Sequence, residues 1–245
     1  MFSPLEQFDL IGILKIFIIG LDFSILNGVL PFFIILFFYI YFLFFIKLRF
    51  KLIPDVWQII CENIYKFVFN IVDQQVGKKG YIYFPFIFII FNFILLSNLL
   101  SLIPFGIALT SYIVLIFFLS ISICIFIFFL GLIKHNVGFF KLFIPKCPFI
   151  LLPILIPIEI FSYIIRMFSL AIRLAANILA GHTLLFIISS FSVKVFSMKF
   201  WFYFLVYIIF FFIFMLELGI AFLQAYVFSI LICIYLNDSL SLGNH

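Results

Sequence analysis

From Ser169 to Leu185 the sequence reads SLAIRLAANILAGHTLL. Arg173, Asn177 and His182 interrupt a run that is otherwise made of aliphatic and small residues. At membrane depth, an arginine costs about 2.5 to 3.5 kcal/mol on insertion scales. So costly a charge indicates either a function or a partner that neutralises it. The stretch therefore predicts a membrane-spanning helix whose role depends on its arginine.

The chain as a whole has the composition of an integral membrane protein. Of its 245 residues, 68% are hydrophobic and 9% are charged, and the mean hydropathy is +1.46. Apolar runs of about 18 or more residues recur along it, and each can cross about 30 Å of hydrocarbon as a helix. Because these runs show no alternation of period two, the predicted fold is all-α rather than a β-barrel.

We predict about five transmembrane helices and one amphipathic helix at the membrane surface. Residues 1–22 form an interfacial lead-in, and residues 54–79 form the surface helix, since apolar positions recur there at helical spacing among charges. The predicted spans are 25–46, 81–103, 112–133, 151–190 and 200–236. The last two are longer than a bilayer is thick, so each must tilt strongly, bend or protrude.

The basic residues indicate the orientation in the membrane. Five crossings place the basic segments 47–51, 66–79 and 134–146 on one side, the inside by the positive-inside rule. The N-terminus then lies outside and the C-terminus inside. The alternative is a re-entrant fourth segment, broken at Pro153 and Pro157, which would move the C-terminus to the other side. These loops account for the net charge of +5, so we expect no nucleic-acid partner.

Several kinds of site are not expected. The four cysteines lack CxxC spacing and are interpreted as small core residues rather than metal ligands. The sequence has no phosphate-binding loop or dinucleotide fingerprint, so we expect no cofactor and no catalytic site within the chain. Glu6 and Asp9 stand where a targeting peptide would be basic, so neither a signal peptide nor a transit peptide is expected.

The fourth predicted span carries a polar track along one face. Its members lie within about 40° of a common line at 100° per residue. They are Glu159, Arg166, Arg173 and Asn177. His182 points roughly 180° away from Arg173, so we expect the track and the histidine to face different ways.

On the fifth predicted span, Glu217, Gln224 and Asp238 are also nearly in line. Carboxylates and histidine can relay protons, whereas arginine keeps its proton at any accessible pH. We therefore interpret the two spans as two polar half-pathways separated by Arg173. Internal salt bridges, such as Arg173 with Glu217, are the alternative. Asn98 on the second span fits equally well with lining the outer pathway and with a hydrogen bond to a neighbouring helix.

These residues resemble a known family, the a subunits of F-type ATP synthases in their mitochondrial form. The first stretch is followed by ELGIAFLQAYVFSILICIYLNDSL from Glu217 to Leu240. SNLLSLIP in the second span and SPLEQF near the N-terminus also look like that subunit. The combination of R-x3-N-x4-H with E-x6-Q-A-Y is highly specific.

The resemblance implies a stator subunit of the Fo sector, whose last two helices tilt against a rotor ring. Arg173 would face the carboxylate of the rotor. The outer pathway would be formed by His182, Glu217, Asn177, Gln224 and Asn98, and the inner pathway by Glu159 and Asp238. No role is transferred to Glu62, Asp73 or Arg166.

The resemblance also implies partners and a location. The partners would be the ring of c subunits, other Fo stator subunits including the peripheral stalk, and membrane lipid, with the proton as the only substrate. Bacterial relatives exchange the residue types found here at His182 and Glu217, which favours the mitochondrial inner membrane. The N-terminus would lie in the intermembrane space and the C-terminus in the matrix. The alternatives are a proton-coupled secondary transporter, which should show internal repeats, and a structural membrane anchor.

Overall fold

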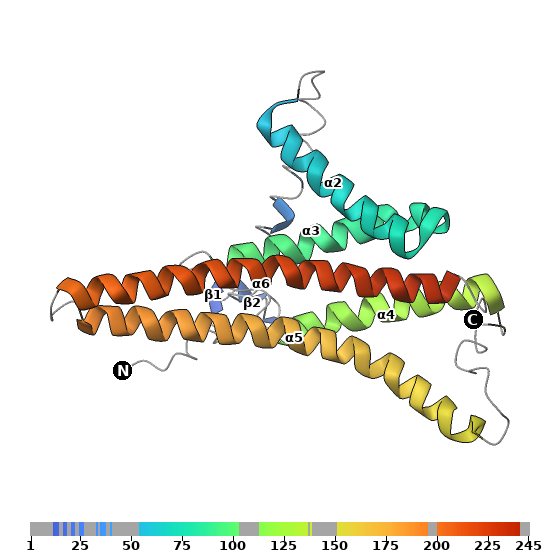
Figure 1. Ribbon diagram of the computed structural model, residues 1–245. Helices are drawn as coiled ribbons and strands as arrows, with labels where there is room; N and C mark the ends of the chain where they lie inside the picture. Colours follow the sequence, from blue (N-terminus) through green and yellow to red (C-terminus); the bar gives the residue numbers. More distant parts are fainter. Residues whose placement is uncertain are drawn as a thin grey trace. The chain divides into compact units, whose positions relative to one another are not determined.

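The computed structural model describes residues 12–14, 17–18, 21–22, 25–26, 33, 35–37, 40, 54–102, 113–136, 138, 151–195 and 200–240. Apart from four strands of two or three residues, the elements of this part of the chain are helical (Figure 1). The chain separates into two compact units. Unit 1 comprises Met1–Arg49, Phe93–Ile113 and Leu174–Ala225, and unit 2 comprises Phe50–Asn92, Val114–Arg173 and Tyr226–His245.

Four helical segments of the described chain are long and apolar enough to cross a membrane. They are Gly77–Ser101, Val114–His135, Leu152–Ser192 and Phe204–Leu240. The prediction of an all-α membrane protein is thereby confirmed, whereas the number of five spans and their tilt stay predictions. Most of the predicted first span, 25–46, lies outside the described residues.

The short strands lie in unit 1, near the start of the chain. Strand β1 (Gly12–Leu14) pairs with β4 (Ile25–Leu26), and β2 (Phe17–Ile18) pairs with β3 (Leu21–Asp22), both antiparallel. They occupy part of the predicted lead-in and the first two residues of the predicted first span. Ile25 and Leu26 therefore belong to a strand, whereas the predicted span of 25–46 as a whole stays a prediction.

Helix α2 (Val56–Gln75) covers most of the predicted surface helix but ends before Lys79. Gly77 has a φ of 69°, a left-handed conformation that suits glycine, and the chain continues as the 3-10 helix η2 (Gly77–Tyr83). The Tyr81 hydroxyl donates a hydrogen bond of 2.6 Å to Asp73 Oδ1. This bond fastens η2 to the end of α2, so Asp73 has a structural role.

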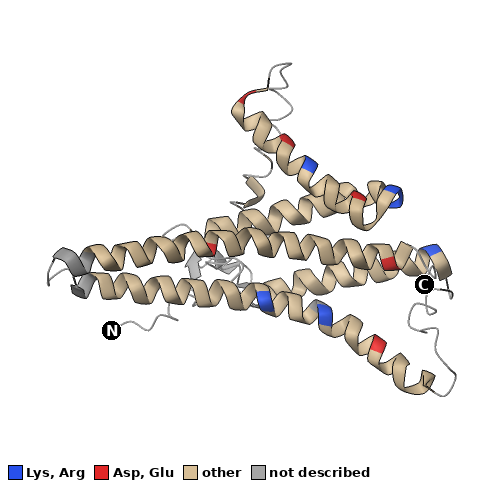
Figure 2. Cartoon of the chain, viewed as in Figure 1, with Lys and Arg blue, Asp and Glu red and all other residues tan. Residues whose placement is uncertain are grey.

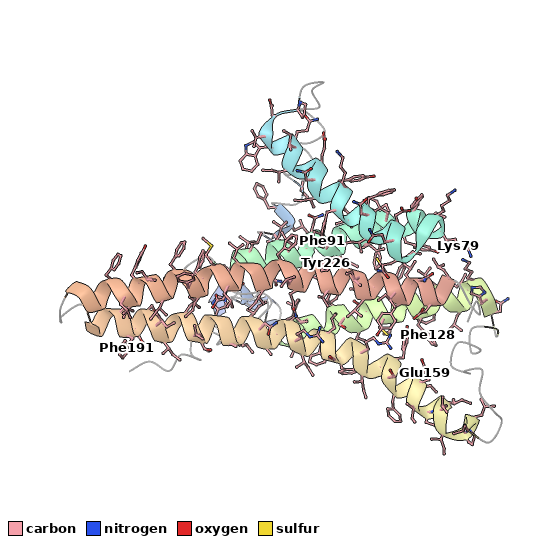
Figure 3. The ribbon with its side chains drawn as sticks, in the orientation of Figure 1. Lys79, Phe91, Phe128, Glu159, Phe191 and Tyr226 are labelled. Atoms are coloured by element: carbon pink, nitrogen blue, oxygen red, sulfur yellow. The ribbon has the colours of Figure 1, made fainter. Side chains whose placement is uncertain are left out.

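Aromatic rings pack α2 against the first half of α3 (Phe84–Ser101) in unit 2. The ring centroid of Phe67 lies 5.8 Å from that of Phe91 and 5.6 Å from that of Tyr226 on α6 (Phe200–Leu240). Figure 3 labels the last two of these residues. The second half of α2, which carries Phe67, also buries Val68, Ile71 and Val72. Aromatic pairs of this kind contribute about 0.5 to 1.5 kcal/mol beyond their buried area.

Helix α4 (Ile113–His135) adds to unit 2 and contacts the end of α6. The rings of Phe126 and Phe86 lie 4.7 Å apart, which joins α4 to α3. Lys134 Nζ lies 3.4 Å from the carbonyl oxygen of Leu240, to which it donates a hydrogen bond. A cation is favourable at a helix C-terminus, where backbone carbonyls lack intrahelical partners. The last residues of α4 and of α6 therefore lie next to each other.

The last two helices are unusually long. Helix α5 (Leu152–Val195) has 44 residues and α6 has 41. At 1.5 Å per residue they measure about 66 and 62 Å, twice the thickness of the hydrocarbon layer. Helix α5 runs through Pro157 without interruption, so the break considered for a re-entrant segment is absent. Figure 2 shows how few charged residues either helix carries.

The first half of α2 exposes a group of apolar side chains, and Trp57 among them is 68% exposed. We expect this half to lie in the membrane interface, which suits tryptophan. In a Trp201→Phe variant Trp57 is the only tryptophan. In vesicles its fluorescence should be quenched by lipids brominated near the headgroup and only weakly by aqueous iodide. The Trp57→Phe variant, which keeps Trp201, is the control. Strong quenching by iodide alone would contradict an interfacial position.

Candidate functional site

Unit 1 contains a cavity of about 300 Å³. It lies among α3, α5 and α6, and the parts of α5 and α6 that belong to this unit run side by side (Figure 1). The apolar side chains around it are Leu102, Leu174, Ile178, Ala180, Leu184, Ile213, Leu216, Ile220 and Ala221. The polar side chains are Asn98, Ser101, Asn177, His182, Glu217 and Gln224, and Gly181 completes the lining. A mostly apolar wall with a few converging polar groups is typical of a functional cavity.

Glu217 is the carboxylate of this cavity. It projects from α6, and its residue is only 9% exposed. Its Oε1 atom is buried and has no hydrogen-bond partner among the described residues. Because a buried polar atom without a partner is costly, a water molecule in the cavity is the natural partner for this oxygen.

The cavity is held in shape by amide hydrogen bonds between helices. Asn98 Nδ2 on α3 donates to the backbone carbonyl of Ala221 on α6 at 3.2 Å. Asn177 Nδ2 on α5 donates to Gln224 Oε1 on α6 at 3.5 Å. Asn98 therefore bonds a neighbouring helix, which is one of its two predicted roles, and it also lines the cavity. Its Oδ1 is buried without a hydrogen-bond partner in the described part of the chain.

His182 lies in the same cavity lining as Asn177. The sequence predicted that these side chains face different ways, because they are separated by about 140° around the helix. Both residues nevertheless line the cavity of about 300 Å³, because this cavity reaches two sides of α5. The titratable groups Glu217 and His182 thus share one cavity.

The other predicted site residues lie in unit 2. Glu159, labelled in Figure 3, and Arg173 are exposed on α5, whereas Asp238 is half-buried near the end of α6. Arg173 is the last residue of the α5 segment in unit 2, and it precedes Asn177 by about one helical turn.

An aromatic cluster surrounds the second arginine of α5. The Cζ atom of Arg166 lies 5.6 Å from the centre of the Tyr235 ring, a cation–π distance. Tyr235 also meets Tyr163 edge to face, at 5.0 Å between centroids. Both phenols lie within electrostatic range of Asp238. Arg166 therefore has a local partner of its own in the Tyr235 ring.

The described residues contain no group of three or more His, Cys, Asp or Glu side chains that could hold a metal ion. The titratable pair in the cavity, Glu217 with His182, can bind and release protons. A carboxyl group and an imidazole in one cavity can pass protons to each other.

Apart from its apolar side chains, the cavity lining contains two residues that the sequence-based prediction of site residues does not include. Ser101 follows Asn98 by three residues and so shares its helix face, a spacing that could have identified it. Its hydroxyl donates a hydrogen bond of 2.6 Å to the Asn98 carbonyl. Gly181 is the other, and no pattern in the sequence brings it close to Glu217.

Known proteins match almost the whole chain. Residues 29–237 match the model of a family described as ATP synthase A chain. ATP synthase subunit a of Acanthamoeba castellanii is 42% identical over 97% of this chain and 97% of its own length. The subunit of Chondrus crispus is 43% identical over 98% of this chain and 96% of its own length, and that of Trichophyton rubrum is 45% identical over 98% and 97%.

A thiol test can establish whether water reaches the cavity. Ser101 is 2% exposed, so a cysteine there can react with a small water-soluble thiol reagent only through the cavity. With the other native cysteines replaced by serine, buried Cys233 remains as the internal control. We expect Ser101→Cys to react faster than Cys233 by about an order of magnitude or more, since only a thiolate in contact with water reacts. Equal rates in intact vesicles would contradict a hydrated cavity.

Proposed function

The chain belongs to the ATP synthase A chain family, and from this we propose that it carries protons as the a subunit in the membrane sector of an ATP synthase. Members of this family are membrane subunits of the complex, not its catalytic subunits. The four membrane-spanning candidates make the chain a multi-pass membrane protein. The observation that carries the proposal is the cavity of unit 1, in which Glu217 and His182 meet three amides and a serine between apolar helices.

In the proposed mechanism this cavity is the outer pathway. A proton from the outer compartment reaches Glu217 and His182, with Asn177, Gln224 and Asn98 holding water and the helices around them. It then passes to a carboxylate on the rotor ring. Once neutral, that carboxylate can enter lipid, because the cost of burying a charge is removed.

The inner pathway is assigned to Glu159 and Asp238. After the ring has rotated, its carboxylate releases the proton toward these two acidic residues and becomes ionised again. Each unit charge that moves down the membrane potential releases about 2.3 kcal/mol per 100 mV, and this free energy drives rotation. Glu159 precedes Arg173 on α5 by about 21 Å of helix, and His182 follows it by about 14 Å.

Arg173 is the barrier between the two pathways. Its guanidinium cannot release its proton, so it cannot pass one from the outer to the inner side. It is exposed on a helix of membrane-spanning composition, where a charge needs a partner. A rotor carboxylate on another chain supplies that partner. The ring of c subunits and the other Fo stator subunits, including the peripheral stalk, are the proposed protein partners.

The proposed location is the inner membrane of a mitochondrion. The relatives named above are eukaryotic, which supports this location. The N-terminus would lie in the intermembrane space and the C-terminus in the matrix. The hydrogen bond from Lys134 to Leu240 supports this topology, because it keeps the C-terminal end of α6 beside the basic end of α4.

Replacing Arg173 by glutamine tests the proposed function. In membranes that contain the assembled complex, Arg173→Gln should abolish ATP synthesis driven by a proton gradient and should increase the passive proton leak, because the fixed charge between the pathways is gone. The rate of ATP synthesis measures the first effect. The quenching of a pH-sensitive fluorescent dye by acidification of the vesicles measures the proton leak.

Arg166→Gln is the matched control for this experiment. It removes the other arginine of α5, whose guanidinium lies over Tyr235, and most of the ATP synthesis should remain. Copurification of the c subunits must show that both variants assemble. An equal loss of synthesis in the two assembled variants would contradict a special role for Arg173.

A further inference from the structure

Gly181 and Glu217 make an unusually close contact across unit 1. A Cβ atom placed on Gly181 would lie 3.0 Å from both Cδ and Oε1 of Glu217, and 3.4 Å from its Cγ. Ordinary contacts of a Cβ atom are longer than this. The carboxyl group of α6 therefore occupies the space that a side chain at position 181 of α5 would fill.

A side chain at position 181 would displace the carboxylate of Glu217 and would leave the helices in place. The atoms that a Cβ would meet belong to the far end of a flexible side chain, and no backbone atom is among them. The cavity beside Glu217 has room for the displaced group. The carboxyl group would therefore have to move by a few tenths of an ångström, whereas the two helices could keep their positions.

We propose that Gly181 is a positioning residue that holds a place on α5 for the Glu217 carboxylate, next to His182. The inference rests on the proposed function in so far as it assigns Glu217 to the outer pathway. By lacking a side chain, Gly181 lets the carboxyl group lie against the backbone of α5, one residue before the histidine. Its role is steric and differs from that of the small residues that merely let helices approach.

The pair can be tested by changing each partner by one carbon. Gly181→Ala adds the Cβ atom, and Glu217→Asp shortens the acidic side chain by one methylene, which withdraws the carboxylate from that position. In vesicles with the assembled complex, Gly181→Ala alone should lower proton-driven ATP synthesis by up to about tenfold, since misplacing a reacting group by about 1 Å costs about a hundredfold and this displacement is smaller. In the double variant the added methyl should cause little further loss beyond that of Glu217→Asp.

Gly219 on α6 supplies the matched control. A Cβ atom there would meet nothing within 4 Å among the described residues, so Gly219→Ala should stay within about twofold of the unmodified protein. Combined with Glu217→Asp, it should add its own small effect and no more. The proposal is wrong if Gly181→Ala leaves ATP synthesis unchanged. It is also wrong if the fold-loss of ATP synthesis in the double variant equals the product of the fold-losses in the two single variants.

Two further measurements separate a failure of this inference from a failure of the proposed function. The outer pH that gives half-maximal proton flux should move in Gly181→Ala and return toward the Glu217→Asp value in the double variant. A purely structural role would lower the amount of assembled complex and leave that pH unchanged, which would overturn the inference. Glu217→Leu tests the proposed function itself, because full ATP synthesis in that variant would remove Glu217 from the pathway whatever Gly181 does.

Discussion

Hydrocarbon offers no hydrogen-bond partner, and this constraint governs every polar group in the chain. A polar side chain in a membrane-spanning helix must find a partner in protein, reach water or contact another charged chain. Asn92 and Ser97 on α3 find their partners within their own helix. Each donates a hydrogen bond to a backbone carbonyl one turn earlier. Such residues are polar in sequence but need no further explanation from function.

The residues around the cavity solve the same problem differently. Asn98, Asn177 and Gln224 bond across helices, whereas Glu217 keeps a buried oxygen that no described residue satisfies. The interhelical amides contribute little to stability, about 0.6 kcal/mol each in measured membrane proteins. Their main effect is to keep α3, α5 and α6 apart by a defined distance, so that the carboxylate borders an open space.

Much of the fold follows from hydropathy alone, since runs of apolar residues must be helices in a membrane. The family could also be recognised from the spacing of Arg173, Asn177 and His182. Local backbone geometry was harder to predict. The end of α2 depends on the left-handed conformation of Gly77, and the strand β4 depends on pairing with residues that precede it in the chain. The helical phase of His182 alone could not show that one cavity reaches both sides of α5. The contact of Gly181 with Glu217 depends on how two distant helix segments pack, which no single-helix pattern contains.

The size of the cavity has an electrical consequence. About 300 Å³ accommodates roughly ten water molecules at their volume in the liquid. Water conducts the potential of its own compartment inward, so little of the transmembrane voltage would fall along a hydrated cavity. The voltage would instead fall across the dry layer of protein and lipid that remains, and the field there would be correspondingly steeper. A proton that crosses this thin layer would release nearly all of the free energy that the membrane potential provides, over a path much shorter than the bilayer.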